Sequence, residues 1–280
     1  MTGQVHRRSP PDGVIPLYID LSTPFDSVGS GYDAIIHLAA IAHSPVDEIA
    51  RAMLKRVNVA ATAMLAHAAA KQKAHFVFLS SAKVMGEQGS WNDSMNPVPE
   101  DAYAHSKREA EEEISRIDDL CFTILRPPLV YGPGVRANFL QMMHWADTPL
   151  PLPLASLTNR RSLLYVENLA DAVLACLQRR NQAHRKIWLL SDGPPTSVAA
   201  LLSTLRSELR RPARLFPFPP TLLAKMATLI NKQGLAQRLT GEFIIDDLDI
   251  RTRLDWQPPY KLGEALQKTI DWYVSAKRPS

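Results

Sequence analysis

The sequence contains very little cysteine and no long run of apolar residues. Its two cysteines, Cys121 and Cys176, lie in apolar stretches, which argues against a disulfide framework or a cysteine-rich metal site. No stretch approaches the roughly 20 apolar residues that a membrane-spanning helix needs, and residues 1–13 lack the apolar segment of a signal peptide. We therefore expect a protein of the reducing cytoplasm, without a membrane partner.

Charge of one sign is also scarce. The formal net charge is only +4, and basic residues occur as scattered pairs such as Arg160-Arg161 rather than as runs. A nucleic-acid partner is therefore not expected, whereas an anionic small molecule would suit isolated arginines. With 280 residues and 46% hydrophobic content, the chain can bury one large core, or a principal domain and a smaller lobe.

Short apolar runs alternate with longer segments of helical period, which is typical of βαβ units around a parallel sheet. The predicted strands are 14–19, 34–38, 76–79 and 122–125, and the predicted helices are 47–72, 103–116, 167–178, 197–209, 221–231 and 262–276. The apolar stripe of the first helix is predicted to consist of Ile49, Met53, Val57, Ala60 and Met64. After Pro127-Pro128, proline-rich turns separate shorter helices. The sequence therefore predicts an α/β fold.

One helical segment carries a phenol and an ammonium group four residues apart, Tyr103 and Lys107. This spacing places both on one helix face. A nearby cation favours the phenolate and would draw the tyrosine pKa from about 10 toward working pH, as an acid–base group requires. Tyr273 and Lys277 repeat the spacing near the C-terminus, where we expect a frayed terminal helix.

Two hydroxyl residues, Ser80 and Ser81, follow the predicted strand 76–79. Parallel sheets bind ligands at the carboxyl ends of their strands, so Ser81 could donate a hydrogen bond to the oxygen atom that exchanges a proton with Tyr103. The alternative for Ser81 is a structural role as a turn or helix cap.

Three motifs in this order carry a family resemblance: Phe78-Leu-Ser-Ser-Ala-Lys-Val-Met-Gly86, Tyr103-x-x-x-Lys107 and Leu125-Arg-Pro-Pro-Leu-Val-Tyr-Gly-Pro-Gly134. From about Asp20 to about Trp256, the chain resembles the extended short-chain dehydrogenases/reductases, or NAD-dependent epimerases/dehydratases, that modify nucleotide sugars. The resemblance implies a Rossmann-like doubly wound parallel sheet. Residues 1–135 would form the dinucleotide-binding and catalytic region, and 136–280 a mainly substrate-binding lobe with some segments returning to the sheet.

The resemblance also implies a site, residue by residue. The catalytic group would be Ser81, Tyr103 and Lys107. The residues expected to bind NAD or NADP are Asp20, Leu21, His37, Leu38, Ala39, Ala40, Asn58, Tyr103, Lys107 and Pro127. Ser81, Asn138 and Arg161 are expected to bind a nucleotide-sugar substrate, Arg161 through its diphosphate. Without their neighbours, His37 and Asn58 would be interpreted as a core histidine and a polar helix residue.

The residues after Ser81 narrow the reaction. Sugar 4,6-dehydratases of the family carry an Asp-Glu pair there and decarboxylases a Glu, whereas this chain has Ala82-Lys83. The resemblance then implies a 4-epimerase or a 4-ketoreductase acting on a UDP-N-acetylhexosamine, for surface polysaccharide. A dehydrogenase acting on a non-sugar hydroxyl, such as that of a sterol, is an alternative. By the same resemblance we expect a homodimer, formed through the helices 47–72 and 103–116.

Glycine is scarce where this family needs it. The chain has no G-x-x-G-x-x-G turn, since Gly3 and Gly13 are isolated. By the resemblance, a βαβ unit that contains the central strand of the sheet would be missing. Strand 34–38 would then present a bare apolar edge, or pair directly with strand 14–19. A further alternative is therefore an impaired remnant that at most binds nucleotide sugar.

Overall fold

The chain forms two compact units whose segments interleave along the sequence. The computed structural model describes residues 2–5, 14–25, 28–42, 47–212, 214–229 and 241–277. Unit 1 comprises residues 1–84, 97–126 and 176–188, and unit 2 comprises 85–96, 127–175 and 189–280. Residues 85–96 and 127–135 thus belong to unit 2, whereas the sequence analysis assigns them to the first domain.

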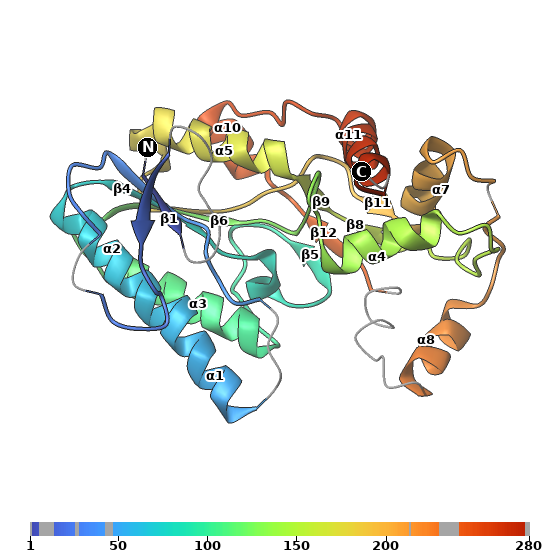
Figure 1. Ribbon diagram of the computed structural model, residues 1–280, viewed down its shortest axis with the longest axis horizontal. Coiled ribbons are helices and arrows are strands. Elements are labelled where there is room, and N and C mark those ends of the chain that lie inside the picture. Colours follow the sequence, from blue (N-terminus) through green and yellow to red (C-terminus); the bar gives the residue numbers. More distant parts are fainter. Residues whose placement is uncertain are drawn as a thin grey trace. The chain divides into compact units, whose positions relative to one another are not determined.

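Unit 1 is built on a four-stranded sheet with the order β10-β6-β4-β3, whose middle strands β6 and β4 are labelled in Figure 1. Its strands are β3 (Ala34–His37), β4 (His75–Leu79), β6 (Cys121–Arg126) and β10 (Lys186–Leu189). β4 pairs in parallel with both β3 and β6. Parallel neighbours require long crossover connections. These contain α1 (Glu48–Leu54), η1 (Lys55–Ala60) and α2 (Ala61–Lys71) before β4, and η2 (Ala82–Met85) and α3 (Ala102–Ser115) before β6. A short helix, α6 (Arg180–Ala183), precedes β10.

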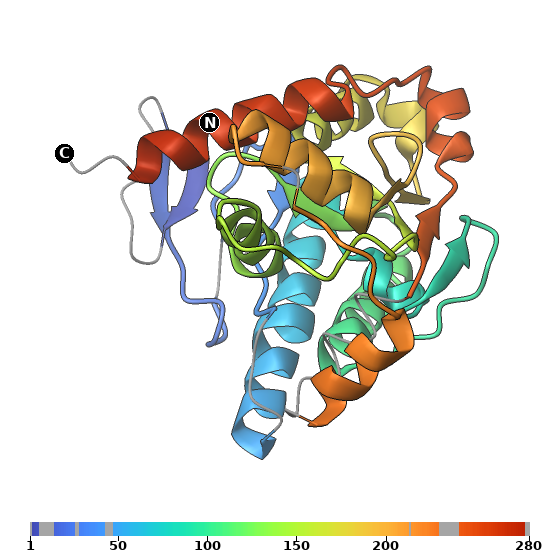
Figure 2. The ribbon, with the colours of Figure 1, turned by 90° about the vertical axis from the view of Figure 1, so that its right-hand side faces the viewer.

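One face of this sheet is covered by α2 and α3, which lie side by side (Figures 1 and 2). Phenylalanines of β4 and β6 point toward the two helices, where alanines allow close approach. The buried residues that form this core include Phe76, Phe78, Phe122, Ile124, Ala66, Ala69, Ala110 and Ile114. The predicted α/β fold with parallel strands is confirmed.

The predicted strand 14–19 is confirmed as β2 (Ile15–Tyr18), but it pairs in parallel with β1 (Thr2–Val5) rather than with β3. Among the described residues, β1 and β2 form a separate two-stranded sheet, and β3 is an edge strand of the four-stranded sheet. Ile36 on β3 is 42% exposed and Leu38 beside it is 58% exposed. In the part of the chain that the structure describes, β3 thus ends the sheet with apolar side chains partly exposed, and the missing βαβ unit stays a prediction.

The predicted stripe of the long helix is only partly correct. Val57 is buried, but Ile49 is 81% exposed and Ala60 is also exposed, whereas Leu54, Asn58 and Leu65 are buried. For the residues after Leu54, the reason is η1, a π-helical segment between α1 and α2. Its wider turn shifts the residues that follow around the helix axis, so that a regular 3.6-residue period does not describe the buried face.

Unit 2 contains short strands packed with helices. One sheet has the order β11-β8-β12-β5, and β7 pairs in parallel with β9. The strands are β5 (Gly89–Trp91), β7 (Leu129–Tyr131), β8 (Arg160–Arg161), β9 (Leu163–Tyr165), β11 (Thr196–Ser197) and β12 (Phe243–Ile245). The helices are α4 (Ala137–Ala146), α5 (Val166–Gln178), α7 (Val198–Glu208), α8 (Pro220–Leu229), α10 (Leu248–Leu254) and α11 (Leu262–Lys277).

The core of unit 2 lies among α4, α7 and α11, and Figure 2 shows α7, in orange, beside α11, in red. Aromatic rings of β7 and β9 contribute to it, and the rings of Tyr131 and Phe139 stack with their centres 5.0 Å apart. In the part of the chain that the structure describes, no helix is long and apolar enough to span a bilayer.

Candidate active site

The side chains of Ser80 and Ser81, which follow β4, form hydrogen bonds with different partners. The Ser80 hydroxyl donates to the Glu111 carboxylate at 2.5 Å and is buried. The Ser81 hydroxyl accepts from the backbone N–H of Lys83 at 3.2 Å, at the start of η2. The turn-capping role that the sequence leaves open for Ser81 is therefore present.

Tyr103 and Lys107 lie one turn apart on α3. The helix begins after Asp101, whose carboxylate accepts from the Ala104 N–H at 2.7 Å and so caps the first turn. The Lys107 ammonium is buried, donates to the Leu79 carbonyl at 2.8 Å and lies 4.4 Å from the centre of the Phe78 ring. These contacts attach α3 to the strand end that precedes Ser81.

The Ser81 hydroxyl lies close enough to the Tyr103 phenol to lower its pKa, so the structure brings the three predicted catalytic residues near one another. Burial and, to a smaller extent, the nearby Asp101 carboxylate raise the pKa of the phenol to about 12, and the neighbouring Ser81 hydroxyl acts in the opposite direction. Burial lowers the pKa of the Lys107 ammonium to about 8, against the attraction of Glu111. The phenol is thus protonated at neutral pH, and the sequence argument that Lys107 draws its pKa downward does not describe this state.

The residues predicted to bind the dinucleotide lie in several segments of unit 1. After β3, Leu38 is exposed, and Ala39 and Ala40 are partly exposed. Asp20 is exposed and accepts hydrogen bonds from Ser22, with Leu21 half-buried beside it. These positions leave polar and apolar surface open to a ligand.

His37 and Asn58 have structural partners. The His37 ring is buried, lies 3.0 Å from the Thr62 hydroxyl and stacks on Phe76 and Phe78. Asn58, on η1, donates to Ser106 at 2.9 Å. It also bonds both backbone groups of Ile41, which follows the predicted cofactor-binding residues Ala39 and Ala40. Both residues therefore shape the end of β3, and their contact with a cofactor stays a prediction.

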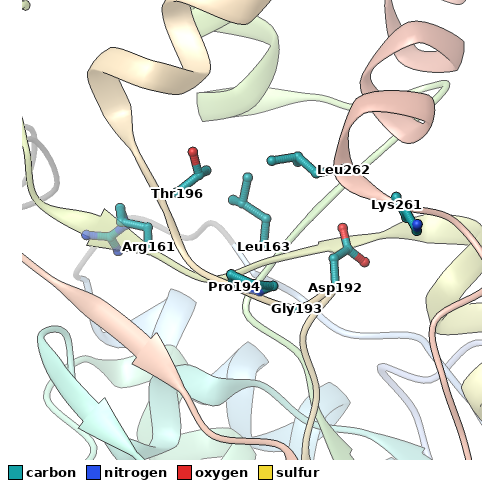
Figure 3. Close-up of a pocket in the computed structure, with 8 residues that line it drawn as sticks. All are labelled: Arg161, Leu163, Asp192, Gly193, Pro194, Thr196, Lys261 and Leu262. Atoms are coloured by element: carbon teal, nitrogen blue, oxygen red, sulfur yellow. The ribbon is translucent and has the colours of Figure 1, made fainter.

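The other predicted site residues belong to unit 2. Asn138 is exposed in the first turn of α4, and Pro127 is buried. Arg161 donates to the Gly241 carbonyl at 2.9 Å and lies over the Phe243 ring. It also borders a cavity of about 320 Å³, and Figure 3 shows its guanidinium pointing away from the Asp192 carboxylate and Lys261. The diphosphate-binding role of Arg161 stays a prediction.

The second tyrosine–lysine pair is ordered, so the prediction of a frayed terminal helix is wrong. Tyr273 is buried on α11, and its hydroxyl lies 3.3 Å from the Asp147 carboxylate. Lys277 pairs with the same carboxylate, which also binds Arg211. This pair anchors a helix in unit 2 and is not attached to a strand end that carries hydroxyls.

Comparison with known proteins identifies the family of the chain. Residues 15–190 match the NAD dependent epimerase/dehydratase family. The chain belongs to this family. It is 33% identical over 269 residues to a UDP-glucose 4-epimerase of Vibrio cholerae, covering 92% of this chain and 82% of the relative. It is 30% identical over 270 residues to a ceramide reductase of Caulobacter vibrioides, covering 92% and 80%.

Solved structures share the fold of this family member at low identity. The UDP-N-acetylglucosamine 4-epimerase of Bacillus cereus superposes with a TM-score of 0.73 at 18% identity, over 99% of this chain and 90% of the other. RMD of Pseudomonas aeruginosa, solved with NADPH, gives a TM-score of 0.72 at 19% identity, over 96% and 92%. These similarities confirm the Rossmann-like fold that the resemblance implies.

Two ion pairs of this epimerase/dehydratase family member were missed by the sequence reasoning. Lys83 pairs with Asp101, and Glu111 pairs with Arg126 at 2.6 Å. A sequence signal existed for Glu111 alone, since it lies one turn after Lys107 on the same helix face. The partners of both pairs lie on other elements, so the pairing itself depends on the fold.

Proposed function

We propose that this chain acts on C4 of a nucleotide sugar of the UDP-N-acetylhexosamine type, as a 4-epimerase or a 4-ketoreductase, in surface polysaccharide synthesis. The observation that carries the proposal is the grouping of Ser81, Tyr103 and Lys107 at the end of β4. The Vibrio cholerae UDP-glucose 4-epimerase, at 33% identity, supports C4 of a UDP-sugar as the reacting centre.

In this proposal Tyr103 exchanges a proton with the sugar oxygen at C4, and the Ser81 hydroxyl donates a hydrogen bond to the same oxygen. The protonated phenol of this structure is the form that reduction needs, because the 4-keto oxygen gains a proton as the carbon gains hydride. Oxidation of the hydroxyl needs the phenolate, which Lys107 would have to stabilise when ligands are bound.

The donor set in unit 1 fits a dinucleotide, NAD or NADP. An ammonium group has three N–H donors, and Lys107 uses one on the Leu79 carbonyl, which leaves donors for ribose hydroxyls. Asp20 and the open segment from Leu38 to Ala40 would hold the rest of the molecule. When bound, the nicotinamide would supply the hydride chemistry, either removal and return of hydride at C4 for epimerisation or its donation to the 4-keto carbon for reduction.

The test is an assay of the whole chain with UDP-N-acetylglucosamine and NAD⁺, and with a UDP-4-keto sugar and NADH or NADPH. Tyr103→Phe should lower kcat at least about 100-fold, the usual contribution of general acid–base catalysis. Tyr273→Phe is the matched control, because it removes a phenol with the same Lys spacing and should keep activity. Unchanged turnover in Tyr103→Phe would rule out the assigned role.

A second candidate is reduction of a non-sugar carbonyl, which the Caulobacter vibrioides ceramide reductase favours at 30% identity over 92% of this chain. The Arg161→Ala variant separates the two. Weakened UDP-sugar turnover in this variant, with its unfolding midpoint kept, supports the nucleotide sugar. Turnover of a ceramide-like ketone that is insensitive to the substitution supports the second candidate.

A third alternative is an impaired remnant that at most binds nucleotide sugar. It rests on the absence of a glycine-rich turn from the sequence. Titration of the chain with NADH and NADPH, followed by the fluorescence of the reduced nicotinamide, decides it. Saturable binding of NADH or NADPH in the micromolar range would contradict the interpretation of the chain as a remnant that has lost its cofactor.

A further inference from the structure

An ion pair connects the two segments that carry the acid–base group. Lys83 lies on η2, two residues after Ser81, and Asp101 is the N-cap of α3, two residues before Tyr103. The two side chains pair directly and are 32% and 42% exposed. The ion pair therefore holds the serine segment against the first turn of the tyrosine helix.

The charges of this pair act on the phenol with opposite signs. The Asp101 carboxylate raises the pKa of Tyr103, as the second cause after burial. Lys83 brings a positive charge to the same carboxylate and offsets its field. Among the described residues, further polar groups near Tyr103 are the Ser81 hydroxyl after β4 and the Lys107 ammonium one turn along α3, whose charge also acts on the neutral ring of His37 on β3.

We propose that Lys83 and Asp101 are positioning residues that set the protonation state of Tyr103. Asp101 favours the protonated phenol, and Lys83 limits that effect by pairing with Asp101. This inference rests on the proposed role of Tyr103 as the acid–base group. It assigns a task to Lys83, which stands where the dehydratases of the resemblance carry an acidic residue.

The consequence concerns the direction of proton transfer. A phenol held protonated is already in the form that gives a proton to a keto oxygen, whereas oxidation needs the phenolate, so the balance between Asp101 and Lys83 favours reduction over oxidation of the sugar. Because both side chains are partly exposed, solvent screens their charges. Each should therefore change the Tyr103 titration by a fraction of a pH unit, on the order of 0.5.

The test measures the titration of Tyr103 directly. The tyrosines of the whole chain are replaced by a fluorinated tyrosine whose phenol titrates near neutral pH, and fluorine NMR follows each signal. The Tyr103→Phe variant assigns the Tyr103 signal by its loss. Asp101→Asn removes the charge but keeps the N-cap, because asparagine caps a helix as well as aspartate. Lys83→Gln removes the cation, and Glu112→Gln, in an exposed ion pair farther along α3, is the control.

We expect Asp101→Asn to lower the titration midpoint, Lys83→Gln to raise it, the double variant to fall between them, and Glu112→Gln to leave it unchanged. Shifts of both single variants in the same direction, as loosened packing would give, or the absence of any shift, overturn the proposal. The readout needs no turnover. Opposite shifts in a chain without activity would therefore uphold the coupling and refute the proposed function.

Discussion

At the scale of single residues, Glu111 is a buried and extensively bonded side chain beside the site. It is fully buried, and its two carboxylate oxygens receive the Ser80 hydroxyl and two N–H groups of Arg126. This network joins α3 to the carboxyl ends of β4 and β6. A buried ion pair adds little net stability against an apolar replacement, but removing one partner leaves the other charge buried and unpaired.

We therefore predict that Glu111→Gln lowers the free energy of unfolding by about 3–5 kcal/mol, because Arg126 remains buried without its counter-charge. Urea unfolding at neutral pH measures the change. Glu112→Gln removes the neighbouring carboxylate, which is 42% exposed and pairs with Arg108 at 3.0 Å. That control should lower the free energy of unfolding by no more than about 0.5 kcal/mol. Equal losses in the two variants would refute the importance of burial.

The sequence predicts the residues of the candidate catalytic group but not their electrostatic partners. Tyr103 and Lys107 are local, since their four-residue spacing places them on one helix face whatever the rest of the fold. Lys83 and Asp101 lie 18 positions apart in the chain, and their pairing requires η2 and α3 to meet at one strand end. The elevated pKa of Tyr103 has the same origin, because burial and Asp101 are properties of the folded site.

At the scale of elements, β3 and β4 each carry a buried histidine that pairs with a threonine. His37 lies 3.0 Å from Thr62, and His75 lies 2.8 Å from Thr123. Burial lowers the pKa of His37 to about 3, assisted by the Lys107 charge, and the pKa of His75 to about 4, assisted by Arg180 and His184. Both rings are therefore neutral in the folded chain.

These histidines predict a loss of stability in mild acid. Below pH about 6.5 the unfolded chain binds protons that the folded rings do not, so each histidine costs about 2 kcal/mol at pH 5. The loss begins at the unfolded pKa and grows until the folded pKa is reached. His37→Gln keeps a partner for Thr62 without titrating. Urea unfolding at pH 7 and pH 5 should show a smaller loss for the variant by about 2 kcal/mol, and equal losses would contradict the buried neutral ring.

The elements that the sequence predicts are those with a strong local signal. The runs that become β3, β4 and β6 are rich in Ile, Val and Phe, and Asp47 caps the helix that α1 begins, accepting from the Ala50 N–H at 2.7 Å. The π-helical η1 has no such signal, and it moves Ala60 out of the buried face on which the regular period places it. Strands β8 and β11 have two residues each, too few to show a period.

At the scale of the whole molecule, the sequence predicts unit 1 far better than unit 2. The alternation of apolar strands with long helices is the signature of a parallel sheet, and the four-stranded sheet confirms it. Unit 2 is assembled from segments that are distant in the chain, such as β5 and β12, which pair across about 150 residues. Such pairing leaves no local pattern in the sequence.

The homodimer stays a prediction, and the structure shows which alanines of the predicted dimer helix are accessible to a second copy. Ala66 and Ala69 are fully buried in the core of unit 1, so they serve the packing of α2 on the sheet. Ala60 is exposed and Ala63 is partly exposed, so these two small residues are available to a second copy.

The central claim is that Tyr103 serves hydride chemistry at C4 of a nucleotide sugar. The most direct measurement follows a UDP-sugar that carries deuterium at C4, incubated with the whole chain and NAD⁺ and examined by proton NMR and mass spectrometry. The account predicts either C4-epimerised sugar that retains deuterium or deuterium transferred to the nicotinamide, and neither product with Tyr103→Phe. Epimerised sugar that has exchanged its deuterium for solvent hydrogen, or product formed equally by Tyr103→Phe, would contradict it.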